Sequence, residues 1–267
     1  MQETKRRGAV NAFELSIAWS SKTLGASASI CPQAYLATYG RYTYHLWSAL
    51  CNIPIGQRSK PETLHMTLHW KGTGVEVHKV VVGPYENNVF TVRCTETGDA
   101  LLIDAANEHE QLLELCQSLG VRTVVETHGH WDHIQAIPAI RDAGYEVGVA
   151  AEDATMLPSY DFILEDDSVI EVGRLRIRTI HNPGHTPGSM SFHVEDTPLL
   201  FSGDTLFPGG PGATNFEGGD FDTIIKSIDE RMFSKFSSET VVLPGHGDDT
   251  TIGSEAPQLQ EWVDRGW

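Results

Sequence analysis

The alternation of apolar and polar residues becomes regular just after Met66 and predicts a chain rich in short strands. The patterned segments either alternate with a period of two or form short apolar runs, and turn-forming residues separate them. They predict strands at residues 75–82, 89–93, 100–103, 121–126, 148–151, 168–172, 175–180, 189–194, 199–202 and 241–243.

A helical spacing of apolar residues interrupts the strands in each half of the chain. Residues 108–119 carry apolar side chains on one face and stop at Gly120, and residues 222–233 carry isoleucines on one face. Residues 133–143 also predict a helix, in which Pro138 predicts a kink or a late start. Because each sheet must bury a face and helices cover the outer ones, the pattern predicts an α/β (α+β) fold of two mixed sheets with helices outside.

Residues 1–65 show neither the two-residue alternation of strands nor the helical spacing of apolar residues. We expect residues 1–65 to be a poorly structured N-terminal extension and residues 66–267 to form the folded domain. A basic start followed by a weakly apolar stretch faintly imitates a secretory signal, but Glu14 interrupts the apolar part, so we disfavour that interpretation. Met66 as the true start of translation is a second hypothesis.

Charge and composition narrow the class of partner. Acidic residues outnumber basic ones 36 to 19, for a formal charge of −17, which disfavours nucleic acid and anionic membrane surfaces as partners. No apolar run approaches the roughly 18 residues of a membrane span. The four cysteines are scattered without a Cys-x-x-Cys pair, which indicates reduced thiols and a cytoplasmic protein. The oligomeric state is left open.

Metal-type ligands gather in the six residues 128–133. His128 and His130 are two residues apart in an extended segment, so their side chains point to one side and can reach one metal. Asp132 and His133 lie at the start of the next predicted helix and point toward a second metal.

Three further candidate ligands follow predicted strands: His185, Asp204 and His246. Loops at strand ends, held by a rigid scaffold, are where catalytic ligands are expected. Imidazole and carboxylate ligands suit zinc, with iron and manganese as alternatives. Two divalent ions of this kind would generate a hydroxide nucleophile at neutral pH, so the sequence predicts a metal-dependent hydrolase acting on a small molecule.

Four motifs carry a resemblance to the metallo-β-lactamase superfamily. They are Thr127-His-Gly-His-Trp-Asp-His133, Pro183-Gly-His-Thr-Pro-Gly-Ser189, Ser202-Gly-Asp-Thr-Leu-Phe207 and Pro244-Gly-His-Gly247. The resemblance implies a four-layer αββα sandwich with the site along one edge of the two sheets. It assigns one metal to His128, His130 and His185, the second to Asp132, His133 and His246, and a bridging position to Asp204. Asp132 and Asp204 are the residues to which it gives catalytic roles.

Within that superfamily the chain resembles the short bacterial hydroxyacylglutathione hydrolases, which are glyoxalase II-like thioesterases. The segment 203–207 and the loop 209–220 carry this likeness. It implies attack of the metal-bound hydroxide on a thioester carbonyl. The sequence departs from the group where the longer members have a C-terminal helical region that helps to hold glutathione, and at Ala213, where such loops often have a basic residue. The acyl group and the thiol of the substrate therefore stay open.

Two alternatives stay open. A persulfide dioxygenase would share the fold and much of the motif set but bind a single iron. A non-catalytic metal-binding protein of the same fold is the other. A β-lactamase is disfavoured, because the resemblance gives those enzymes no aspartate at the position of Asp204.

Three features near the ligand motifs have two interpretations each. Asp104, at the end of a predicted strand, either orients a metal-bound histidine or is merely structural. Trp131 is either a packing residue or a wall of the substrate site. The loop 209–219 lacks the Gly-Lys-Ser/Thr that would end a phosphate-binding loop, so we interpret it as a rim of the active site.

Overall fold

The computed structural model describes residues 66–266 of the chain. The expected extension at residues 1–65 lies outside the described residues, as does Trp267. Within the described part of the chain, no helix has the length and apolar character needed to cross a membrane.

The first sheet has seven strands that lie side by side in chain order. Its first four strands pair antiparallel, and the pairs from β4 to β7 are parallel, so the sheet is mixed. Helices α2 (His109–Leu119), α3 (Trp131–Ile134) and α4 (Ile137–Asp142) connect the parallel strands. The strands are β1 (Thr67–Gly72), β2 (Val75–Val82), β3 (Asn87–Cys94), β4 (Ala100–Ile103), β5 (Val121–Val125), β6 (Glu146–Ala150) and β7 (Phe162–Leu164).

The second sheet has six strands in the order β15-β14-β11-β10-β9-β8. Only β11 and β14 are parallel, and the connection between them includes helix α5 (Phe221–Ser227), which continues as the π-helix η1 (Ile228–Phe233). A two-stranded ribbon of β12 (Leu206–Phe207) and β13 (Gly210–Pro211) precedes α5. The sheet strands are β8 (Val169–Val172), β9 (Leu175–His181), β10 (Met190–Val194), β11 (Leu199–Gly203), β14 (Val241–Pro244) and β15 (Thr250–Thr251).

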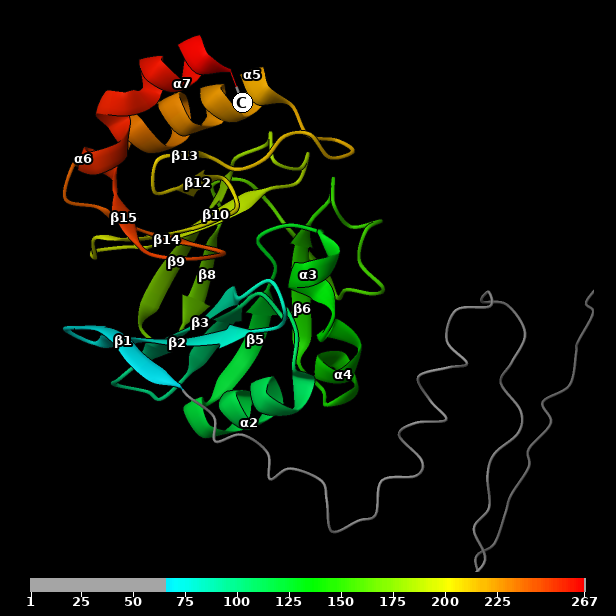
Figure 1. The fold of residues 1–267 in the computed structure, drawn as a ribbon. Coiled ribbons are helices and arrows are strands. Elements are labelled where there is room, and N and C mark those ends of the chain that lie inside the picture. Colours follow the sequence, from blue (N-terminus) through cyan, green and yellow to red (C-terminus); the bar gives the residue numbers. More distant parts are fainter. Residues whose placement is uncertain (1–65, 267) are drawn as a thin grey trace, which may run out of the picture. The chain divides into compact units, whose positions relative to one another are not determined.

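Three layers of buried side chains join the sheets and helices. One lies between the first sheet and helices α2 and α4, and one lies between the two sheets. The third packs the second sheet against α5, η1, α6 (Ile252–Glu255) and α7 (Leu259–Arg265), with Trp262 fully buried in it. Figure 1 shows the resulting order of helices, sheet, sheet and helices. The predicted αββα sandwich is therefore confirmed.

Contacts across the middle layer hold the two sheets together. Phe90 on β3 and Phe201 on β11 meet edge to face, with ring centroids 5.2 Å apart. Both side chains are almost fully buried, and such a pair contributes about 0.5–1.5 kcal/mol beyond its buried area. The relative position of the two sheets is thus fixed close to the strand ends that carry the candidate ligands.

The structure differs from the sequence expectations at a few elements. The predicted helix over residues 133–143 is two short helices. Pro138 lies in the first turn of the second one, where a backbone N–H would have no acceptor within the helix. Strand β1 was not predicted, because it is a half-exposed edge strand whose register shifts between Leu68 and Trp70. That irregularity removes the alternation on which a prediction depends.

Candidate metal centre

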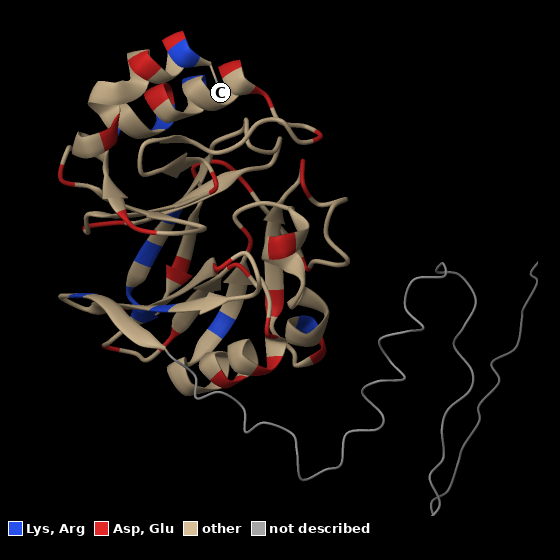
Figure 2. Ribbon diagram, viewed as in Figure 1, with Lys and Arg blue, Asp and Glu red and all other residues tan. Residues whose placement is uncertain are grey.

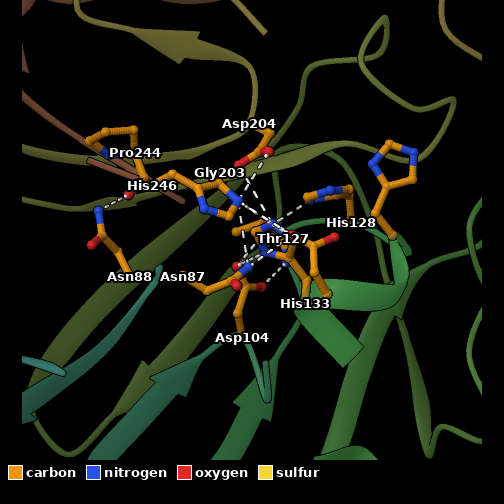
Figure 3. A network of polar contacts seen from close by, with 12 residues as sticks. Asn87, Asn88, Asp104, Thr127, His128, His133, Gly203, Asp204, Pro244 and His246 are labelled. Atoms are coloured by element: carbon orange, nitrogen blue, oxygen red, sulfur yellow. Dashed lines mark hydrogen bonds and ion pairs between the residues drawn. The ribbon is translucent and has the colours of Figure 1, made fainter. Parts of the chain in front are cut away.

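The candidate ligands lie at one edge of the two sheets, in loops that follow strands and in the helix α3 that follows one of these loops. His128 and His130 follow β5 of the first sheet, and Asp132 and His133 open α3. His185, Asp204 and His246 follow β9, β11 and β14 of the second sheet. Figure 3 shows His128, His133, Asp204 and His246 converging from these loops. The structure therefore brings all seven predicted side chains to one site.

Gly203 permits the approach of two of these loops. Its φ is +52°, and a Cβ atom there would lie 2.6 Å from Cβ of Thr127, which precedes the first ligand. Only glycine combines that backbone conformation with that contact. The Ser-Gly-Asp sequence thus sets Asp204 against the loop of His128 to His133.

The ligand atoms form three overlapping groups, each within 4.8 Å. Nε2 of His185 lies 2.9 Å from Nδ1 of His130 and 3.2 Å from Nε2 of His128. On the other side, Nε2 of His133 lies 3.2 Å from Nε2 of His246. Two nitrogen ligands of one tetrahedral zinc, each about 2.0–2.1 Å from the ion, are roughly 3.3 Å apart, so the separations suit shared coordination. The groups are His128 with His130 and His185, His128 with His133 and Asp204, and Asp132 with His133 and His246.

Asp204 lies between the two outer groups. Its Oδ1 is 3.6 Å from Nε2 of His133, and its Oδ2 is 3.7 Å from Nε2 of His185 and 3.6 Å from Nε2 of His246. The Oδ1 atom is buried and has no hydrogen-bond partner. A buried carboxylate oxygen without a partner is costly, and a cation would satisfy it. The residues present therefore fit a site for metal ions.

The lowered pKa values of His128, His130 and Asp132 favour the protonation states that bind cations. Burial, reinforced by neighbouring imidazoles, lowers the pKa of His128 well below its ordinary value and that of His130 to about 4. Burial alone would raise the pKa of Asp132, but the hydrogen bond to His246 and the charge of His133 outweigh it, and the net shift is downward. Neutral imidazoles and ionised carboxylates are the protonation states that bind metal.

His133 shows the competition between proton and metal. Burial would lower its pKa, but the carboxylates of Asp204 and Asp104 raise it well above the ordinary value. A proton on this imidazole and a cation beside Asp204 both offset the negative charge of the same carboxylates. Metal binding at this site is therefore expected to release a proton.

Hydrogen bonds at the far ring nitrogens orient several of the imidazoles. Nδ1 of His185 donates to the carbonyl of Ala213 at 2.7 Å, and Nδ1 of His246 donates to the carbonyl of Tyr85 at 2.8 Å. Nδ1 of His133 lies 2.8 Å from Oδ2 of Asp104. A neutral imidazole that donates from Nδ1 in this way turns the unprotonated lone pair of Nε2 toward the cluster, and His133 reaches this state once its extra proton is released. The interpretation of Asp104 as a carboxylate that orients a ligand is the one this contact supports.

Two buried residues near the site have no signal in the sequence that could have found them. Asp153, in the turn after β6, accepts hydrogen bonds from the backbone N–H of Gly129 at 2.8 Å and of Gly188 at 2.7 Å, and from the hydroxyl of Thr186 at 2.7 Å. It therefore joins the loop of His128 and His130 to the loop of His185. Asn87, at the start of β3, donates from Nδ2 to Oδ2 of Asp132 at 3.0 Å.

An open cavity of about 840 Å³ lies over the cluster. Trp131 and Tyr85 form one wall and meet edge to face with ring centroids 5.3 Å apart. Phe207 and the loop from Pro208 to Phe216 form the other. Trp131 thus lines the cavity rather than the core, and the loop 209–219 borders it as expected. The volume suits a small molecule.

Residues 82–246 match the family model of the metallo-beta-lactamase superfamily, and the chain belongs to that superfamily. Hydroxyacylglutathione hydrolase GloC of Haemophilus influenzae is 31% identical over 179 residues, covering 59% of this chain and 84% of that protein. The fold resembles that of the BLEG-1 B3 metallo-beta-lactamase, with a TM-score of 0.63 and 27% identity, covering 68% of this chain and 96% of that one. It also resembles TTHA1623 in a di-iron-bound form, with a TM-score of 0.59 and 31% identity over 67% and 96% of the two chains.

The family assignment confirms the predicted superfamily and the general class of metallo-hydrolase.

Proposed function

We propose that this protein hydrolyses a small thioester at a site that holds two divalent metal ions. The observation that carries the proposal is the position of Asp204, whose carboxylate lies within 3.7 Å of Nε2 of His185 in one outer histidine group and of Nε2 of His133 and His246 in the other. The similarity to hydroxyacylglutathione hydrolase GloC supports a thioester as the substrate class.

One ion would be held by His128, His130 and His185, and the other by Asp132, His133 and His246, with Asp204 reaching both. When bound, divalent ions in such a site lower the pKa of water toward neutrality and polarise a substrate carbonyl. We propose zinc as the ion. Imidazole and carboxylate donors also suit iron and manganese, and the similar TTHA1623 structure is in a di-iron form.

The residues of the chain perform the remaining tasks. Asp104 holds the proton of His133 on Nδ1, and Asn87 keeps the carboxylate of Asp132 turned toward His246. Asp153 fixes the spacing of the two loops that carry the first histidine group. Trp131 and Tyr85 cover one side of the cavity and exclude water from the substrate. Positioning groups in advance in this way lowers the barrier, because they need not reorganise during the reaction.

The alternatives from the sequence are less well supported. A persulfide dioxygenase with one iron needs only one of the outer histidine groups, and the second, around His246, would then have no role. A non-catalytic metal-binding protein has no need of an 840 Å³ cavity that opens onto the ligands.

The proposal is tested by elemental analysis together with hydrolysis assays on thioesters and on a persulfide. We expect two metal ions per chain and thioester hydrolysis that a chelator abolishes. Asp204→Ala should lower turnover by several orders of magnitude and reduce the metal content. Asp142→Ala, at the exposed end of α4, is the matched control and should behave as the wild type. Near-normal turnover with full metal content in Asp204→Ala, or oxygen consumption with the persulfide alone, would overturn the proposal.

A further inference from the structure

The residues that line the cavity indicate the chemistry of the part of the substrate that would lie outside the metal cluster. We propose that the thiol portion of the substrate is uncharged and apolar, aromatic or aliphatic, and that the site discriminates against thioesters of anionic thiols. This inference rests on the proposed thioester hydrolysis and specifies its substrate class.

Three large aromatic side chains at the mouth of the cavity are exposed, although most of the large apolar side chains in residues 66–266 are buried. Tyr85 and Phe216 are each 57% exposed, and Trp131 is 55% exposed. All three line the same cavity, and contacts hold them in place: Tyr85 packs against Trp131, and Phe216 packs against the ring of His130 with centroids 5.4 Å apart. Exposed aromatic groups that gather on one cavity indicate a surface that an apolar ligand covers.

The charges around the cavity favour the same conclusion. Asp132 and Asp204 are the only charged residues among the described residues that line it, and both belong to the metal cluster. The segments that line the cavity, residues 80–92, 123–140, 179–225 and 236–264, contain no lysine or arginine. Lys79 donates from Nζ to the carbonyl of Gly247, next to His246, but it does not line the cavity. In Figure 2 the ribbon and loop around β12 and β13 accordingly carry no blue segment.

An anionic thiol would therefore enter the cavity without a cationic side chain to meet it. Removing a carboxylate from water without such a partner is unfavourable. The acidic surface, with 36 acidic against 19 basic residues, would also slow the approach of an anion. An uncharged thiol meets neither obstacle.

A cationic thiol is less well matched than an uncharged one. Aromatic faces attract cations, but at this mouth two bound divalent ions would offset the charge of Asp132 and Asp204 and repel a second positive group. The cavity then offers a cation no carboxylate of its own. Apolar contact with the aromatic walls is the interaction that remains.

The test compares four thioesters that share one acyl group, lactoyl, and differ only in the thiol. The thiols are benzyl mercaptan, N-acetylcysteamine, thiocholine and glutathione, which are aromatic, neutral polar, cationic and anionic in turn. For the metal-loaded full chain we expect kcat/KM to be at least about tenfold higher for the benzyl thioester than for the glutathione thioester, with the difference mainly in KM. A glutathione or thiocholine thioester that equals or exceeds the benzyl thioester would overturn the inference.

Variants of the wall residues test recognition of the thiol separately from hydrolysis of the thioester bond. Trp131→Ala should lower kcat/KM for the benzyl thioester by about tenfold and leave the glutathione thioester almost unchanged. Ala213→Arg, which places a cation on the cavity wall, should raise kcat/KM for the glutathione thioester by about tenfold. Tyr160→Ala removes an exposed aromatic group outside the cavity and should change neither value.

The outcome distinguishes this inference from the proposed function. If the metal-loaded protein hydrolyses none of the four thioesters, the proposed function fails. If it hydrolyses them without the expected order, or if Trp131→Ala affects all four equally, only the inference about the thiol fails.

Discussion

Oδ2 of Asp104 lies 2.8 Å from Nδ1 of His133, and both side chains are almost completely removed from solvent. Asp104 also accepts hydrogen bonds from the backbone N–H of Thr127 at 2.6 Å and from its hydroxyl at 2.9 Å. One carboxylate thus orients a candidate ligand and holds the strand end from which the ligand loop departs. A carboxylate behind a metal-bound imidazole raises the basicity of the ligand.

Replacement of Asp104 by Asn should weaken metal binding. The amide keeps the size of the side chain but removes the negative charge that faces His133, so we expect metal affinity to fall by about 10–100-fold. Titration with zinc against a competing chromophoric chelator measures this change. Asp99→Asn is the matched control, because Asp99 lies at the other end of β4 and pairs with Arg122 on the surface. Equal affinities in the two variants would contradict the assignment.

Asp153→Ala should destabilise the fold more than any surface substitution in the same turn. The change leaves two backbone N–H groups and the hydroxyl of Thr186 buried without their acceptor, and each such group costs about 1–3 kcal/mol. We expect the free energy of unfolding in urea to fall by about 3 kcal/mol or more. Glu152→Ala, at the exposed neighbouring position, should leave it nearly unchanged. A loss of under about 1 kcal/mol for Asp153→Ala would show that the turn does not depend on this carboxylate.

Gly203→Ala and Gly209→Ala form a matched pair that separates backbone strain from steric contact. Both glycines have positive φ, at +52° and +84°, so both variants carry about 1 kcal/mol of conformational strain. Only at Gly203 would the new methyl group meet a neighbour, Cβ of Thr127 at 2.6 Å, whereas nothing lies within 4 Å at Gly209. We expect Gly203→Ala to lose metal and thermal stability and Gly209→Ala to lose only a little stability. Elemental analysis and thermal melts check both, and equal behaviour would argue against the close approach.

Burial raises the pKa of the Cys116 thiol to about 12 and makes stability depend on alkaline pH. The unfolded thiol titrates near its ordinary value of about 8.5. The raised pKa in the folded state means that this contribution is complete below about pH 8.5 and is lost as pH rises toward 12. Between about pH 8 and about pH 10 we expect the wild type to lose about 2 kcal/mol more unfolding free energy than Cys116→Ala. Urea unfolding at both values measures the difference, and parallel losses in the two proteins would refute it.

The sequence predicts the ligand loops well because each contains turn-forming residues that mark the end of the preceding strand. The Pro-Gly-His turns that contain His185 and His246, and the Ser-Gly-Asp turn that contains Asp204, each follow a segment with the pattern of a strand. The pattern alone places these ligands after strands, whereas the resemblance to the metallo-β-lactamase superfamily implies that they meet along one edge of the two sheets.

The supporting residues could not be predicted in the same way. Asp153 acts through contacts with Gly129 and Gly188, which are 24 and 35 residues away along the chain. Asn87 reaches Asp132 across 45 residues. Lone polar residues in turns look alike in a sequence, and only the docking of the elements reveals which one is buried. The edge strand β1 and the short helices α6 and α7 were missed for a related reason: their local pattern is weak, and the sandwich defines them.

The candidate ligands span the chain from residue 128 to residue 246, and the last of them follows β14, which enters the second sheet parallel to β11. A nascent chain that has been synthesised only as far as α5 already contains six of the seven side chains, yet β14 and His246 are still missing from the sheet. Because a domain folds as a unit, the proposed second ion, which His246 would help to hold, could bind only after this strand has been made. We therefore expect the proposed centre to be loaded late in biogenesis, and a truncated product that ends before β14 to have an incomplete centre.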